Sequence, residues 1–233
     1  MSVMEKLKRF RRSRKKYLIT AVLLAAFAAL MLYGRNSGLH RSKLVYSQSL
    51  DEAAAEVNGT ELTLREVAFY VAVEEAQVEK QAYEYDPENP KKYWNTHVNG
   101  LYIRVAARNA AIQMAIHDEV FYQLAMNEGV ALSAEEEEHF LFMYEEYLSD
   151  FTEDGKMERL GVSPDDIYES MCKMAYAQKY QSIYAQLSDA AYEEYNFGEA
   201  RYEELLKQQN YVIHKDVWGR VDFGNVTISR EEE

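Results

Sequence analysis

The chain has 233 residues, of which 48% are hydrophobic and 28% are charged, and it contains only ten glycines and three prolines. This composition is typical of a helix-rich globular protein and excludes fibrous and disordered chains, while the length excludes a large multidomain enzyme. The single cysteine, Cys172, excludes an internal disulfide and a cysteine-based zinc cluster.

The charge is distributed very unevenly along the chain. Residues 1–16 hold eight of the 26 basic residues and one of the 39 acidic residues. This leaves 18 basic and 38 acidic residues beyond, so a basic arm of net charge +7 precedes a body of net charge −20. An acidic body repels phosphate groups, so we expect no nucleic-acid partner.

The basic arm leads into an apolar run at residues 17–33, YLITAVLLAAFAALMLY, which contains no charge. As a helix it would span roughly 25 Å, which is sufficient to cross a bilayer. A cleaved signal peptide is the alternative, but its apolar region is normally shorter and ends in a small-x-small site. We therefore predict an uncleaved transmembrane anchor at residues 17–33, with a cytoplasmic N-terminus and an extracytoplasmic C-terminal domain.

A short tether and a β-hairpin follow the predicted anchor. Residues 34–50 are polar and contain glycine and serine, which favours a tether and a folded domain that begins near residue 51. Two short alternating arms flank Asn58-Gly59 and predict a hairpin over residues 55–62. The sequence Asn58-Gly59-Thr60 also fits a glycosylation sequon, for which a turn is the simpler explanation.

Four helices are predicted from capping and periodicity. Capping boxes that begin at Thr63 and Ser133, and an N-cap at Ser163 with Pro164 at the first helical position, predict helix starts. The first helix is expected to end before Asp86-Pro87. The second helix is predicted from near Asn99 to residue 128, the third as far as residue 148, and the fourth through residue 187. The third is expected to bury Phe140, Leu141, Tyr144 and Leu148, and the fourth Ile167, Met171, Met174, Ile183 and Leu187.

The last part of the chain changes its period from helical to alternating. Residues 200–209 predict a fifth, short helix, and Tyr211 and Ile213, followed by Val217, Val221 and Phe223, alternate as strand residues do. We expect these strands to pair with the 55–62 hairpin. The predicted fold is therefore mainly α, with an N-terminal transmembrane helix and a multi-helix domain (residues 51–187) completed by a closing helix and short strands (residues 188–233).

These features resemble the N-terminal domain of SurA-type periplasmic chaperones and PrsA-type foldases. The resemblance covers roughly residues 52–187 and depends on Val57-Asn58-Gly59, on His117-Asp118-Glu119-Val120 leading into Gly129, and on Ser133-Ala134-Glu135-Glu136. In that family a helical domain binds unfolded polypeptides, often beside an inserted parvulin prolyl isomerase domain. Only 46 residues follow Leu187 here, so the isomerase activity is not carried over.

Together with the predicted anchor, the resemblance implies a membrane-anchored extracytoplasmic protein that captures unfolded or extended polypeptides during secretion, without enzymatic chemistry. A scaffold that docks one folded envelope partner is the alternative, and an extracytoplasmic enzyme is a third, weaker one. We expect no cofactor and no metal. Glu136-x-x-His139 matches one element of carboxylate-bridged metal sites but has no second copy. His117-Asp118 could act as an acid–base pair but has no accompanying nucleophile motif.

Aromatic residues provide the candidate client-binding positions. The chain has 19 tyrosines, and rings with a polar tip suit a surface that binds varied apolar segments and stays soluble. Helical spacing is equally compatible with core packing, so both interpretations stay open. The candidates are Phe69, Val73, Tyr93, Trp94, Tyr176, Tyr180 and Tyr184. Cys172 is interpreted as a small apolar core residue. Arg108 is interpreted as a side chain whose apolar stem lies along the helix face while its charge reaches water.

Overall fold

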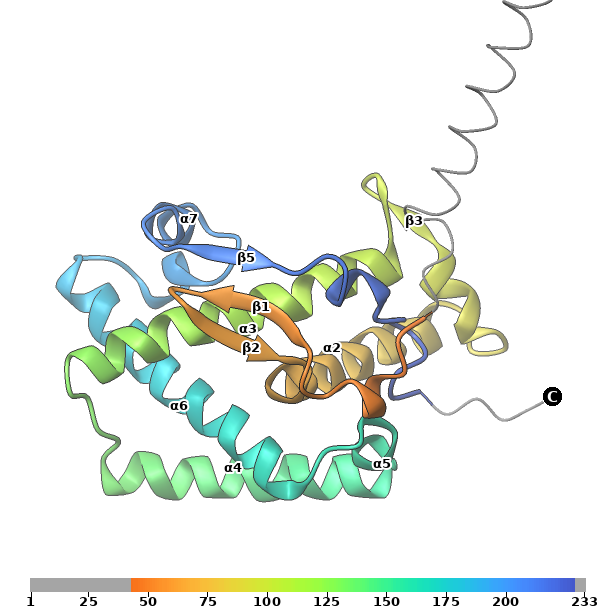
Figure 1. Cartoon of the computed structure of the whole chain (residues 1–233), viewed down its shortest axis with the longest axis horizontal. Coiled ribbons are helices and arrows are strands. Elements are labelled where there is room, and N and C mark those ends of the chain that lie inside the picture. Colours follow the sequence, from red (N-terminus) through yellow and green to blue (C-terminus); the bar gives the residue numbers. More distant parts are fainter. Residues whose placement is uncertain (1–42, 229–233) are drawn as a thin grey trace, which may run out of the picture. The chain divides into compact units, whose positions relative to one another are not determined.

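The computed structural model describes residues 43–228, which belong to one unit that begins at Lys43 (Figure 1). Its longer elements are α-helices, and short 3-10 helices connect them. The α-helices are α2 (Leu64–Tyr85), α3 (Ile103–Asn127), α4 (Ala134–Glu153), α5 (Lys156–Leu160), α6 (Pro164–Leu187) and α7 (Ala200–Leu206). The 3-10 helices are η1 (Tyr46–Gln48), η2 (Pro90–Asn95), η3 (Tyr192–Tyr195) and η4 (Trp218–Arg220).

Two small antiparallel sheets accompany the helices. The larger has the strand order β2-β1-β5, from β1 (Ala53–Val57), β2 (Thr60–Thr63) and β5 (Tyr211–Ile213). Ala55 of β1 pairs with Leu62 of β2 and with Ile213 of β5. The predicted hairpin and its pairing with a strand from the end of the chain are therefore confirmed. Asn58 and Gly59 form the turn, with φ of 52° and 87°, because these residues adopt left-handed backbone conformations most readily.

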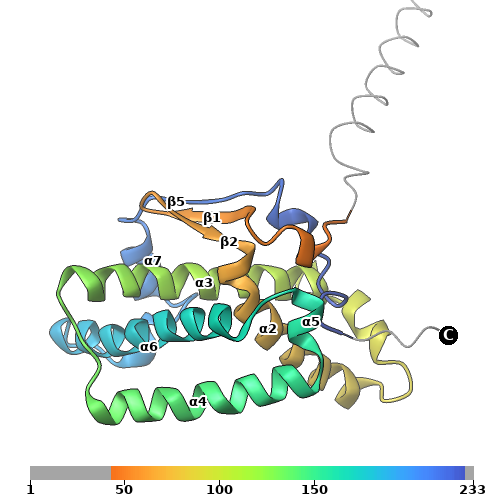
Figure 2. The same ribbon diagram turned by 60° about the horizontal axis from the view of Figure 1, so that its bottom comes forward.

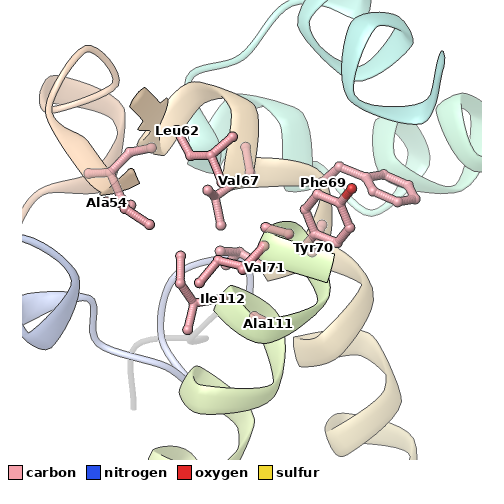
Figure 3. Close-up of a cluster of buried hydrophobic side chains, with 14 of the residues drawn as sticks. Ala54, Leu62, Val67, Phe69, Tyr70, Val71, Ala111 and Ile112 are labelled. Carbon is pink, nitrogen blue, oxygen red and sulfur yellow. The ribbon is translucent and has the colours of Figure 1, made fainter. Parts of the chain in front are cut away.

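Helices α2, α3 and α6 pack around the main core, and α4 lies on the outer side of α6. In Figure 2, α3 lies on one side of α6 and α4 on the other, while the sheet covers α3. Figure 3 shows Val71 of α2 facing Ile112 and Ala111 of α3, with Ala54 and Leu62 of the sheet nearby. The sheet and the helices therefore share one core. Each fully buried aliphatic side chain in it contributes ~1.5–3 kcal/mol to stability.

A charged network joins α6 to the other two core helices. Lys173 of α6 donates to Glu66 of α2 at 2.9 Å and to Glu119 of α3 at 3.0 Å. Burial raises the pKa of Glu66, but hydrogen bonds from Thr63 and Lys173 reverse the shift and leave this pKa below its usual value. Lys173 thus connects α6 to both α2 and α3 through charged hydrogen bonds.

Both predicted capping boxes are present, and the predicted N-cap Ser163 forms a third. Thr63, Ser133 and Ser163 each accept from the backbone three residues later, and the acidic side chain at that position accepts from the cap backbone. Helix α2 ends at Tyr85, before Asp86-Pro87, as predicted. Helix α4 continues to Glu153, five residues beyond the predicted end, and α5 was not predicted.

The predicted start of the second helix was wrong. Residues 97–102 form a second hairpin, β3 (His97–Val98) and β4 (Leu101–Tyr102), and α3 begins only at Ile103. Its turn is Asn99-Gly100, with φ of 50° and 88°, the same chemistry as in the first hairpin. Strands of two residues are too short to produce an alternating pattern, which is why periodicity did not reveal them.

Two apolar positions were also assigned wrongly. Leu141 of α4 and Leu187 at the end of α6 are exposed, at 46% and 78%, rather than buried. Helix α4 contacts the rest of the protein along a narrow stripe, and Leu141 lies beside that stripe. Leu148 of α4 is half-buried but does not pack against the core, whereas the other positions predicted for these two helices lie in or against it.

The C-terminal segment does not continue as a strand. Val221 and Phe223 are buried, but residues 214–228 form η4 and turns. The carboxylate of Glu75 in α2 accepts from the backbone of Gly224, Val226 and Thr227 and from the Thr227 hydroxyl. Burial raises the pKa of Glu75, and these hydrogen bonds oppose the increase. The segment is therefore held by a buried acceptor instead of a strand ladder.

The boundary of the folded domain also differs from the prediction. Leu44 and Tyr46 are buried, and the Tyr46 hydroxyl donates to the Leu64 carbonyl at 2.6 Å. Residues 44–50 thus belong to the domain and not to a tether. Within residues 43–228 no helix is both long and apolar enough to cross a membrane. The predicted anchor at residues 17–33 lies outside the described residues.

Candidate functional site

A groove of about 560 Å³ lies between α4 and α6. The two helices approach closely at one end, where the Tyr144 hydroxyl of α4 donates to the Pro164 carbonyl at 3.2 Å and its ring meets Tyr168 of α6. The walls of the groove between them are formed by Leu132, Glu135, Glu136, His139, Phe140, Met143, Tyr147, Met171, Met174, Ala175, Gln178 and Lys179.

Methionine and aromatic side chains dominate the apolar part of the groove. Met143 comes from α4, and Met171 and Met174 come from α6, with Phe140 and Tyr147 beside them. Methionine is unbranched and polarizable, so it adapts to differently shaped apolar partners better than a branched side chain does. The lining is therefore suited to apolar ligands that vary in shape.

One ion pair crosses the groove. Lys179 of α6 lies 2.5 Å from Glu136 in the first turn of α4, where Glu136 also accepts from the Ser133 backbone. The Lys179 hydrogen bond, followed by that of Ser133, lowers the pKa of Glu136 to about 2. Both side chains are partly exposed, at 23% and 43%, so the pair is screened by solvent and contributes at most about 1 kcal/mol.

A second groove of about 290 Å³ adjoins the first. Tyr147, Met174 and Gln178 line both grooves, so the two grooves share a wall. The second groove is lined by α2, α3, α6 and the η3 region, and Phe197 at its edge is 42% exposed. An extended segment that fills the first groove could thus continue into the second.

A buried polar cluster lines part of the second groove. Asp118 lies 2.8 Å from Nδ1 of His117, and the Tyr70 hydroxyl donates to Asp118 at 2.9 Å. Nε2 of His117 lies 3.0 Å from the Tyr195 carbonyl, which can only accept, so Nε2 carries a proton. Both ring nitrogens of His117 and both carboxylate oxygens of Asp118 therefore have polar partners within the protein. The contact between His117 and Tyr195 joins α3 to η3.

Two of the predicted client-binding residues line the grooves. Phe69 and Val73 of α2 lie at the second groove, although Phe69 is only 3% exposed. Tyr93 and Trp94 lie in η2, away from both grooves. Trp94 is buried against Gly224, where φ is +84° and a Cβ atom would lie 2.7 Å from the Trp94 ring, so that only glycine fits.

The tyrosines of α6 lie among aromatic neighbours. Tyr180 is buried, and Tyr184 packs against Phe121 and Tyr195 with ring centroids 6.1 Å and 5.1 Å away. Tyr176 meets the edge of Tyr122. Tyr180 therefore packs in the core, as one of the two alternatives predicted. Contact of the seven candidate residues with a client stays a prediction.

The methionines of the grooves were not predicted as site residues. Met171 and Met174 were predicted as core residues of the fourth helix, and Met143 and Tyr147 were not singled out. The signal that could have found them is the recurrence of methionine on the two long helices that begin at Ala134 and Pro164. Arg108, as predicted, is half-buried, and its guanidinium donates to the Gly219 carbonyl at 2.9 Å.

Glu136, His139 and Cys172 are the remaining candidate positions from the sequence. Glu136 and His139 both line the first groove, but no group of three or more His, Cys, Asp or Glu residues in the described range 43–228 could hold a metal ion. Cys172 is half-buried against the core, and burial raises the pKa of its thiol, which makes the thiol less reactive.

Comparison with known proteins gives one match. The family model described as a SurA-like N-terminal domain matches residues 7–160, more than half of the chain. No curated protein and no solved structure matches the chain. The matched range includes α2 to α5, whereas α6, which forms the other wall of the groove, follows it.

Proposed function

Because the chain belongs to the SurA-like N-terminal domain family, we propose that it is a chaperone-like protein that binds unfolded or extended polypeptides in the groove between α4 and α6. Binding is reversible capture of apolar segments, without isomerase or other enzymatic chemistry. The observation that carries this proposal is the depression formed by the two adjoining grooves, lined by Met143, Met174 and Tyr147, on a domain of a chaperone-related family.

The size and lining of the depression fit a polypeptide ligand. Ligand sites in proteins are typically concave, mostly apolar and a few hundred Å³ in volume, with a few polar groups at their edges. Gln178 in the shared wall and Glu136 with Lys179 at the first groove provide such polar groups. The apolar walls would bury client side chains, while the polar groups would contact the client backbone.

The charge of the domain supports reversible capture. The chain beyond residue 16 carries a net charge of −20. Like charge keeps loaded complexes apart, and it attracts cationic segments of client chains. A client bound to this surface therefore stays dispersed instead of aggregating.

We place the domain at the outer face of the cytoplasmic membrane. The uncharged run at residues 17–33 would serve as a single-pass anchor, and the eight basic residues before it favour a cytoplasmic N-terminus. Tethering would raise the effective concentration of the groove near secreted chains as they emerge.

Aggregation suppression by the full chain in lipid nanodiscs tests the proposal. Several unrelated unfolded proteins are diluted from denaturant with and without stoichiometric amounts of the nanodisc-bound protein, and light scattering is measured. We expect suppression for each of them. The variant Met143→Glu should lose this activity because a charge in the apolar wall disfavours burial of client side chains.

The matched control is Phe142→Glu, one position away. Phe142 is 63% exposed and is not part of the groove. Equal loss of suppression in both variants, or no loss in Met143→Glu, would show that clients do not bind in the groove. Circular dichroism of both variants establishes that they remain folded.

A second candidate function is docking of one folded envelope partner. The exposed Leu141 and Phe142 on α4 favour it, because adjacent apolar side chains in solvent are typical of interaction surfaces. The two functions differ in promiscuity. A scaffold would leave the aggregation of every unrelated protein unchanged, and Phe142→Glu rather than Met143→Glu would abolish binding of its single partner.

A further inference from the structure

The β3–β4 hairpin exposes apolar side chains without covering any core. Val98 and Leu101 pair with each other across the hairpin and are each 45% exposed, and Tyr102 is 52% exposed. In Figure 1 the hairpin projects from the body at the amino end of α3. An isolated two-stranded hairpin is only marginally stable, and these side chains bury little area against the domain. They therefore contribute little to the stability of the fold.

The hairpin is nevertheless well defined. The rings of His97 and Tyr102 meet edge to face with centroids 5.2 Å apart. The backbone of Ile103 donates to the Thr96 carbonyl at 3.0 Å and closes the base. The apolar pair Val98 and Leu101 is therefore presented in a fixed arrangement, which suits contact with an external surface.

The charge pattern around the hairpin differs from that of the rest of the domain. The sequence from residue 89 to residue 117 contains no Asp or Glu, although the chain beyond residue 16 carries 38 of them. The same stretch contains Lys91 and Lys92, both exposed in η2, and Arg104 directly after the hairpin. Two acidic residues directly precede this stretch. Asp86 lies 4.0 Å from Lys92 and partly offsets its charge, and Glu88 is exposed.

The entry of the chain into the domain lies at the base of this hairpin. Lys43 pairs with Asp222 at 2.6 Å, and Arg104 reaches the same carboxylate at 3.9 Å. Nine residues, 34–42, separate Lys43 from the apolar run at residues 17–33. Fully extended, nine residues reach at most ~30 Å, so an anchor at residues 17–33 would keep this end of the domain near the bilayer.

We propose that the β3–β4 hairpin, together with Lys91 and Lys92, binds the anionic headgroup surface of the membrane. This inference rests on the membrane anchoring in the proposed function. Val98, Leu101 and Tyr102 enter the boundary between headgroups and acyl chains, and the two lysines contact lipid phosphates. Apolar and aromatic side chains beside lysines are the combination that binds such a boundary. The acidic remainder of the domain is repelled by the same surface.

This contact would orient the groove away from the lipid. Helix α3 runs from the hairpin to the α3–α4 connection, and the amino end of α4, with Glu135 and Glu136, follows at that far end (Figure 1). A helix of 25 residues is ~37 Å long. With the hairpin in contact with the membrane, the groove would lie toward the aqueous side, where secreted chains emerge.

The test measures how deeply the hairpin lies in lipid. The full chain, with Cys172→Ser to remove the native thiol, is reconstituted into vesicles of phosphatidylglycerol and phosphatidylcholine. A bimane label is attached at Val98→Cys or, as a matched exposed control, at Phe142→Cys on α4. Quenching by lipids with a nitroxide on the acyl chain should be several-fold stronger at position 98. Lys91→Glu with Lys92→Glu should bring quenching at position 98 close to that at position 142, because each lysine near an anionic surface contributes to its binding.

Other outcomes overturn the inference in distinguishable ways. If the protein floats with the vesicles but position 98 is quenched no more than position 142, the hairpin does not contact lipid and the anchoring is unaffected. If the protein does not float with the vesicles, both the anchoring and the hairpin contact are wrong. If an added unfolded client protects the label at position 98 and lipid does not quench it, the hairpin is a protein-binding surface.

Discussion

Two lysines of α6 show how differently this helix is held on its two sides. Lys173 binds Glu66 and Glu119, and the Glu119 side chain is only 3% exposed. Lys179, less than two turns further along, binds Glu136 of α4 across an open groove, and the Glu136 side chain is 43% exposed. The first contact fixes α6 within the core, whereas the second can break in water at little cost.

The neighbouring helices show the same difference. Helix α3 has 11 buried residues among 25, and α4 has two, Phe140 and Phe151, among 20. Helix α4 is also the more acidic of the two, with eight Asp or Glu residues against two in α3, so composition and packing both contribute to the contrast. Part of the apolar face of α4 lines the groove and is not covered by the core, so a ligand can contact it.

The largest expected effect is the loss of a central ring of α3. Phe121 is fully buried, and Phe121→Ala should lower the free energy of unfolding by about 3–5 kcal/mol because it leaves a cavity among aromatic neighbours. Phe142→Ala on α4 should change it by less than about 0.5 kcal/mol. Urea denaturation of both variants measures the two values. Similar losses in the two variants would remove the distinction between the helices.

A smaller effect is expected from the two lysines. Lys173→Ala leaves the buried carboxylate of Glu119 without its cation and should lower the free energy of unfolding by about 2–3 kcal/mol. Lys179→Ala should lower it by less than about 1 kcal/mol. The same denaturation experiment compares them. A larger effect at Lys179 would mean that α4 is held as firmly as the core helices.

The smallest effect is the pH dependence of the ion pair across the groove. The pKa of Glu136 is lowered to about 2, so its stabilising contribution is complete above the unfolded value of 4.5 and is lost as the pH falls from about 4.5 to about 2. The stability difference between the native protein and Glu136→Gln should therefore be constant above pH 5 and shrink below it. A difference that persists unchanged at pH 2 would contradict the assigned pairing.

Local chemistry made much of the fold predictable from the sequence. The capping boxes at Thr63 and Ser133 and the N-cap at Ser163 act within four residues, and so does the Asn58-Gly59 turn, which is why each was placed correctly. Pairing of the two ends of the domain followed from the alternation around Tyr211. The same reasoning would have found Asn99-Gly100, had the turn been given more weight than the periodicity that follows it.

The groove was not predictable in this way. Whether an apolar face of α4 is sealed or open depends on the distance between α4 and α6, which periodicity does not encode. The alternation of Val217, Val221 and Phe223 was likewise misleading, because the segment is positioned by the distant carboxylate of Glu75 and not by a strand partner. Long-range contacts of this kind decide both the open groove and the closing segment.

Site-specific photo-crosslinking tests the central claim, that clients bind in the groove between α4 and α6. Benzoylphenylalanine replaces Met174 in the groove or Phe142 outside it, in the full chain in nanodiscs, and a radiolabelled unfolded client is added before irradiation. We expect client adducts at position 174 and few at position 142. Equal adducts at both positions, or adducts at position 142 alone, would contradict binding in the groove.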